Sequence, residues 1–119
     1  GSFLQLAANE KWGFKLFLEY TSNSTADFKF DFTSPAGSAL RYVAQYDSGG
    51  TWTTTEASGS DLITIATADT NPHYIIIEGT IHNGGTAGDL QLRWAQNSAT
   101  VVNTTVYEES YMFAWHLNP

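Results

Sequence analysis

The sequence predicts an all-β protein, an antiparallel β-sandwich of the jelly-roll type with about nine strands. Apolar and polar residues alternate with a period of two along most of the chain, which is the pattern of half-buried strands. Turn-forming residues recur at intervals of roughly 8–12 residues, and no segment shows a helical period. At 119 residues the chain is large enough for one hydrophobic core. We expect residues 1–2 to be a cloning scar and residues 3–119 to form a single jelly-roll domain.

The first two predicted strands show the alternation most clearly. In residues 11–20, Lys15 and Glu19 alternate with large apolar residues, so the two kinds of side chain point to opposite faces. Residues 27–33 repeat the pattern with phenylalanine at every second position. Both strands are therefore predicted to turn one face to the core. The core-facing residues are Trp12, Phe14, Leu16, Leu18 and Tyr20 in the first strand and Phe28, Phe30 and Phe32 in the second.

Turns separate the strands that follow. Residues 34–38 carry Pro35 and Gly37 at the spacing of a tight turn, and residues 46–50 and 82–88 are rich in glycine. The segments between these turns are predicted to be strands. They are residues 39–46, 51–56, 61–67 and 73–81, with residues 101–106 and 110–117 closer to the C-terminus.

One further strand lies within residues 88–100, where strict alternation ends in a small polar cluster. We expect its apolar residues in the core and its polar residues on the outer face or at a subunit contact. Gln96 and Asn97 can each donate and accept hydrogen bonds where this strand ends. The core-facing set is Leu90, Leu92 and Trp94, and the outer set is Asp89, Gln91 and Arg93.

The last predicted strand, residues 110–117, has no strongly polar face. A strand that is apolar on both sides is either central in the core or buried at a subunit contact, and the sequence leaves both interpretations open. Tyr111, Phe113 and Trp115 share one face, and Met112, Ala114 and His116 share the other.

The charge of the chain excludes some classes of partner. The formal net charge is −7 and the isoelectric point is about 4.6, so the chain repels phosphate backbones and anionic lipid headgroups. We therefore expect no nucleic-acid partner. The longest apolar runs are too short to span a bilayer, so no membrane insertion is expected. Cysteine is absent, which excludes disulfides, thiolate metal sites and a cysteine nucleophile.

No residue pattern indicates a metal ion or another cofactor, and we expect none. The three histidines lack the spacing of a zinc site, and no carboxylate cluster accompanies them. The aspartates could supply calcium ligands, but none lies in the loop pattern that binds calcium. The histidines are His73, His82 and His116, and the aspartates are Asp27, Asp31, Asp47, Asp61 and Asp69.

Catalytic residues are not predicted either. Glu19 and Glu78 are the one plausible pair of carboxylates for a small jelly-roll glycosidase, a reading that we rank third. The simpler interpretation is that each faces solvent. No serine lies in a nucleophile motif, so we expect a protein that is not an enzyme.

Aromatic residues in the middle of the chain are candidates for a sugar-binding site. Trp52 lies in a threonine-rich segment beside a turn, without apolar neighbours in the sequence. Together with Tyr42 and Tyr46, which share one face of the preceding strand, it could stack on a sugar ring. Packing in the core is the alternative for all three residues.

Two long segments resemble a domain of tail and virion-surface proteins of tailed bacteriophages and their prophages. The first is "ANEKWGFKLFLEYTSNSTADFKFDFTSPAG" (residues 8–37), which is similar to the family's opening hairpin. The second is "GGTAGDLQLRWAQNSATVVNTTVYEESYMFAWHL" (residues 84–117), which is similar to its closing strands. The resemblance runs from about residue 6 to residue 117. One departure is "EES" (residues 108–110), where the family usually has Gly-Ser before the last strand.

The resemblance implies a compact jelly roll similar to the trimeric tumour-necrosis-factor and complement globular-head domains. It implies a non-enzymatic structural domain of a phage virion, at a tail fibre, a tail tip, or a capsid spike or decoration. The expected partners are two further copies in a homotrimer, other virion proteins and bacterial cell-surface glycan, with roles in receptor binding, adhesion or particle stabilisation. The expected location is the virion surface, after synthesis in the bacterial cytoplasm. The candidate subunit-interface residues are Arg93, Tyr111, Phe113 and Trp115.

A monomeric carbohydrate-binding module of a larger enzyme is the alternative function. It requires an exposed aromatic platform, for which Trp52 is the first candidate. The oligomeric state distinguishes the two functions, because a carbohydrate-binding module of this kind is a monomer and the virion domain assembles.

Overall fold

Ten β-strands make up the regular structure in residues 2–101, 103–107 and 110–118, which the computed structural model of the chain describes. No helix occurs in these residues. Glu108 and Glu109, the departure from the family pattern, lie outside them. The strands are β1 (Ser2–Leu6), β2 (Lys11–Thr21), β3 (Phe28–Thr33), β4 (Ala39–Ser48), β5 (Thr51–Ser58), β6 (Ile63–Ile65), β7 (His73–His82), β8 (Gly88–Ala95), β9 (Thr105–Val106) and β10 (Tyr111–His116).

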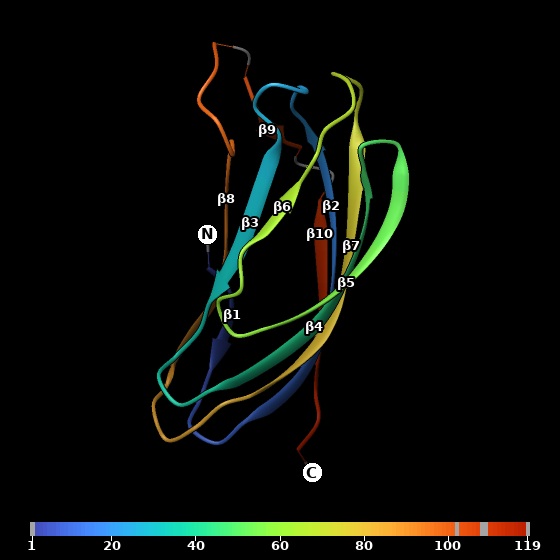
Figure 1. Cartoon of the computed structure of the whole chain (residues 1–119). Coiled ribbons are helices and arrows are strands. Elements are labelled where there is room, and N and C mark those ends of the chain that lie inside the picture. The colour runs from blue at the N-terminus through green and yellow to red at the C-terminus, as the bar shows by residue number, and fades with distance from the viewer. Residues whose placement is uncertain (1, 102, 108–109, 119) are drawn as a thin grey trace.

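The strands form two sheets that pack face to face (Figure 1). The smaller sheet has the order β1-β8-β3-β6. The larger, six-stranded sheet has the order β10-β2-β7-β4-β5, and β9 also pairs with β2. Every pair is antiparallel. The predicted antiparallel β-sandwich with a jelly-roll-like arrangement is therefore confirmed.

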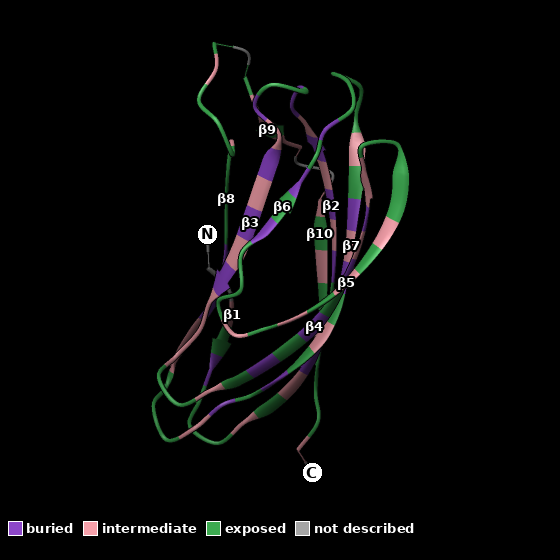
Figure 2. Cartoon of the chain, viewed as in Figure 1, coloured by how far each residue is buried: buried purple, intermediate pink, exposed green. Residues whose placement is uncertain are grey.

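The alternation of the sequence builds the core between the two sheets. Even-numbered apolar residues of β2 and β3 are buried, and Figure 2 shows the buried segments alternating with less buried ones along these strands. Phe32 of β3 joins the layers, because its ring lies 5.9 Å from the ring of Phe14 on β2 and 5.0 Å from that of Tyr42 on β4. Residues 11–20 and 27–33 thus form strands with the predicted core faces, in which Trp12 is only partly buried.

Two strands near the ends of the chain differ from the prediction. β1 was not predicted, because its five residues give too short a pattern and its pairing with β8 shifts register between Ser2 and Leu4. In the predicted strand 101–106, only β9 pairs with β2, and Val101 is fully exposed. The count therefore rises from about nine strands to ten in the described residues.

The strand β8 follows the predicted alternation except at its last apolar residue. Leu90 and Leu92 are buried in the core, as expected. Trp94 is 41% exposed, although its ring stacks on Phe28 with 5.9 Å between the ring centroids. The prediction that Trp94 enters the core is wrong, because this residue lies one position before the strand ends and only one side of its ring is covered.

The final strand, β10, lies at an edge of the six-stranded sheet and pairs only with β2 among the described strands. The interpretation as a central core strand is therefore excluded. Met112 and Ala114 pack against the core, while the aromatic residues between them point outward. The core therefore explains one of the two apolar faces of this strand, and the other face is exposed.

Candidate functional site: an aromatic strip on the outer face of the larger sheet

The outer face of the six-stranded sheet, which is turned away from the core, carries aromatic residues on three neighbouring strands. On β10, Tyr111, Phe113 and Trp115 are 57%, 69% and 42% exposed. The alternation of β2 and β7 places Phe17 and Tyr74 on the same face. We call these five residues the aromatic strip. Exposed apolar patches are typical of interaction surfaces, so we take this strip as the candidate site.

Three rings of the strip stack on one another across the strands. Tyr111 lies directly opposite Phe17 in the register of β10 and β2, with their ring centroids 5.3 Å apart and their planes 20° from parallel. On the other side, Phe17 stacks on Tyr74 at 5.4 Å and 29°. Both faces of the Phe17 ring are therefore covered, and the stack turns ring edges outward.

Trp115 continues the strip toward the other end of β10. It lies opposite Gly13 of β2, and a Cβ atom added at Gly13 would be 2.4 Å from Cε2 of the indole. The indole therefore rests on the backbone of Gly13, which is why glycine interrupts the large residues of β2 here. This support fixes the ring in one orientation while 42% of the residue stays exposed.

A groove of about 670 Å³ runs beside the strip. A second groove of about 510 Å³, which we call the polar groove, continues it toward β5. Glu78 and Val43 line both. Lys15 lies opposite Glu78 in the strand register. Arg41 and Glu56 line the second groove. The surface therefore becomes polar and charged with distance from β10. The outer face thus has an aromatic half and a polar half.

Arg93 lies apart from the other predicted interface residues. It is on β8 of the smaller sheet and forms a bidentate pair with Asp31, in which Nε is 2.9 Å and Nη2 is 2.6 Å from the two carboxylate oxygens. This contact with Asp31 raises the pKa of Arg93. The structure brings Tyr111, Phe113 and Trp115 together, but it places Arg93 on the opposite layer of the sandwich.

The three residues predicted to bind a sugar do not share a surface. Tyr42 and Tyr46 are buried in the core, where burial, with Asp61 and Asp31 nearby, raises the pKa of Tyr42 to about 12. Trp52 lies on the outer face of β5, opposite Asp47 of β4, and is 55% exposed. For the two tyrosines the alternative interpretation, packing in the core, describes their position.

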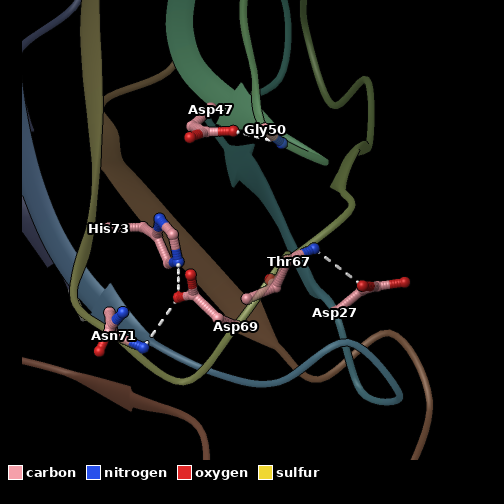
Figure 3. Close-up of polar contacts among 7 residues, drawn as sticks. All are labelled: Asp27, Asp47, Gly50, Thr67, Asp69, Asn71 and His73. Atoms are coloured by element: carbon pink, nitrogen blue, oxygen red, sulfur yellow. Dashed lines mark hydrogen bonds and ion pairs between the residues drawn. The ribbon is translucent and has the colours of Figure 1, made fainter.

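The aspartates named above accept hydrogen bonds from other groups of the protein. At the end of the sandwich shown in Figure 3, three of them accept hydrogen bonds from backbone N–H groups at 2.8–2.9 Å. In the part of the chain that the structure describes, no three acidic or histidine side chains converge as metal ligands would. The contacts drawn are Asp27–Thr67, Asp47–Gly50, Asp69–Asn71 and Asp69–His73. Asp61 similarly accepts a bond from Ser58, and Asp31 binds Arg93.

The histidines are distributed over both ends of the larger sheet. His73 Nε2 lies 2.9 Å from Oδ1 of Asp69, and the N–H of Asn71 together with His73 lowers the pKa of Asp69. His116 Nε2 lies 3.1 Å from Oε2 of Glu10. His82 is at the opposite end of β7 from His73. His73 and His116 therefore each contact a different acidic residue.

Glu19 and Glu78 lie on the outer face of neighbouring strands but not side by side. Glu19 is opposite Tyr74, and Glu78 is opposite Lys15. The two positions lie four residues apart along β7, so their backbones are offset by roughly 13 Å at the rise of a strand. Glycosidases hold their two carboxyl groups about 5–9.5 Å apart across the substrate. The strand register does not place Glu19 and Glu78 opposite each other, and the glycosidase interpretation stays a prediction.

Sequence reasoning missed Phe17 and Tyr74 as members of the surface. The signal was present in β2, where Phe17 lies between Lys15 and Glu19 on the face that the alternation makes polar. In β7, Tyr74 and Ile76 likewise break the alternation by making a continuous apolar run. An apolar residue on the polar face of an otherwise alternating strand is therefore the useful signal.

The fold and the surface define a β-sandwich protein with an exposed aromatic sheet face. Comparisons of the chain with protein-family models, curated proteins and solved structures found no match. The resemblance to phage virion domains stays a prediction. Within the described ranges, there is also no helix with the length and apolar character needed to cross a membrane.

Proposed function

We propose that this protein is a non-enzymatic module of a bacteriophage or prophage virion surface, acting in host adhesion or in particle stabilisation. It works by associating with copies of itself through the aromatic strip. The single observation behind this proposal is that the strip is exposed on one sheet face although its residues are among the largest apolar ones in the chain. The sequence resemblance supplies the virion context and implies three copies.

Burial of the strip supplies the driving force for association. Each aromatic side chain offers a large apolar area, and burial of such area is worth about 25 cal/mol per Å². Phe113 is 69% exposed and contributes little to the core of a single chain. A large apolar side chain without a role in the core is explained if a partner covers it.

The double variant Tyr111→Ser/Phe113→Ser tests the self-association. We expect light scattering to give a multiple of 13.1 kDa for the unaltered chain and a single-chain mass for the variant. Thermal unfolding should stay cooperative, because both side chains point away from the core. Trp52→Ser is the matched control, since Trp52 has similar exposure on the far edge of the same face. An unaltered chain that is monomeric at all concentrations contradicts the proposal.

A second candidate function, binding of cell-surface glycan, is favoured by the position of Trp52. This residue is exposed on the outer face of β5, and Glu56, Ala57 and Ser58 line the polar groove farther along the same strand. Exposed indoles stack on sugar rings, and polar neighbours bind the hydroxyl groups. Loss of the Trp52 ring should then remove binding.

We expect Trp52→Ala to lower binding to bacterial glycans at least tenfold on a glycan array. Trp94→Ala is the control, because Trp94 is also partly exposed but lies on the smaller sheet. Equal glycan binding by Trp52→Ala and the unaltered chain would eliminate this candidate. The result does not bear on self-association, which is measured separately.

A further inference from the structure

We infer that the free edge of β10 pairs with β10 of a second copy, antiparallel and around a two-fold axis, so that the six-stranded sheets of the two copies become continuous. This inference rests on the proposed self-association and specifies its geometry as a two-fold pair, in place of the three copies that the sequence resemblance implies. The occupant of the surface is a second copy of this chain, and the contact combines backbone hydrogen bonds with the aromatic strip.

The strands that end the two sheet orders, β1, β6, β5 and β10, differ in how they are protected against pairing. β6 has three residues, and β1 shifts register in its pairing with β8. β5 carries Glu56 on its exposed face. By contrast, β10 has six residues without a single Asp, Glu, Lys, Arg or Pro. Natural sheets blunt their edges with charge, proline, bulges or short length, and β10 shows none of these devices.

The backbone groups of β10 divide between β2 and the free edge. The N–H of Leu117 donates to the carbonyl oxygen of Lys11 on β2 at 2.8 Å. In an antiparallel ladder, alternate residues direct both backbone groups to the same neighbour. The odd-numbered residues of β10 therefore bond to β2, and Met112 and Ala114 direct their N–H and C=O groups to the free edge.

A two-fold axis makes these free groups complementary. A central register places Phe113 opposite Phe113 of the other copy, and Met112 of each copy opposite Ala114 of the other. Met112 and Ala114 then exchange both backbone bonds, as a hydrogen-bonded pair of an antiparallel ladder does. The same register places Tyr111 opposite Trp115, so all three outward aromatic residues of β10 form cross-strand pairs. Each pair is isologous, as two-fold contacts require.

Local charge also favours a contact at this edge. Two copies with a formal net charge of −7 each repel one another as whole molecules. On β2, next to the edge, Lys11 and Lys15 outnumber Glu19, and β10 has no carboxylate. The side chains of β10 itself therefore add no like-charge repulsion to the contact.

Opposite charges at position 113 test the two-fold register. We expect Phe113→Lys and Phe113→Glu each to be monomeric, because like charges then face one another across the axis. An equimolar mixture should recover twice the single-chain mass, since Lys then faces Glu. Trp52→Lys, on the opposite edge of the sheet, should leave the mass of the unaltered chain unchanged. A heterologous three-fold contact gives no such specific recovery.

Ala114→Pro tests the backbone pairing separately. Proline removes an N–H that faces the free edge, which edge strands tolerate, so circular dichroism should show a folded chain with at least a tenfold weaker association. A monomeric unaltered chain overturns both the self-association and the inference. A mass of three chains, association that survives Phe113→Lys, or a mixture without recovery overturns the inference alone and leaves the aromatic strip as an association surface.

Discussion

Replacing Phe32 with alanine is expected to lower the free energy of unfolding by about 3–5 kcal/mol. The ring is fully buried and contacts aromatic rings of both layers, Phe30 in its own strand and Phe14 and Tyr42 in the larger sheet. Its removal leaves a cavity between the sheets that rigid strands cannot close. Since domains of this size are stable by about 5–15 kcal/mol, much of the total stability would be lost. Chemical denaturation measures the change.

Two controls identify the cause of this loss. Phe32→Leu keeps most of the volume and should cost clearly less than the alanine variant. Phe113→Ala removes the same side chain from an exposed position and should leave the stability of the monomer nearly unchanged. A Phe32→Ala variant as stable as Phe113→Ala would show that Phe32 does not join the layers.

The sandwich could be predicted from the sequence because its core obeys the simplest rule of a strand. Period-two alternation in residues 11–20 and 27–33 marks which side chains enter the core, and both segments form strands with those core faces. Glycine-rich turns then separate the strands. The pairing order could not be predicted, because alternation states which face is buried but not which strand lies alongside.

The candidate surface could be predicted only in part. The two apolar faces of residues 110–117 indicated a special role, but whether that strand was central or at an edge depends on long-range pairing. The grouping of Tyr42 and Tyr46 with Trp52 did not follow from their positions along the strands. The hairpin of β4 and β5 places Trp52 opposite Asp47, on the face away from both tyrosines. Register across a turn decides this, and the sequence leaves it open.

The aromatic strip and the polar groove lie on different parts of the outer sheet face, so the two proposed functions use different surfaces. Near β10 the surface is apolar and ends in an open strand edge, which suits a contact between copies. Near β5 it is polar and carries one exposed indole, which suits a hydrophilic ligand. A two-fold contact at β10 would leave the β5 half of each copy free. Assembly and adhesion are therefore compatible on the same face.

Gly79→Ala is expected to destabilise the larger sheet by about 3 kcal/mol, at the upper end of the usual cost of overpacking. Gly79 lies opposite Tyr42 in the pairing of β7 with β4. An added Cβ would be 2.4 Å from the carbonyl oxygen of Arg41 and 2.6 Å from Cβ of Tyr42. Neither neighbour is the end of a flexible side chain, so the backbone of β4 must move. Chemical denaturation and thermal unfolding measure the loss.

Gly85→Ala is the matched control, because an added Cβ there meets no atom within 4 Å. It should change the free energy of unfolding by less than about 0.5 kcal/mol. Gly79 also lines the polar groove between Glu78 and Thr80, so displacement of β4 would alter the distance across that groove. If Gly79→Ala lost stability but kept glycan binding, the groove would tolerate a shift of β4. If it were as stable as Gly85→Ala, the close approach of β4 and β7 would not be a constraint on this fold.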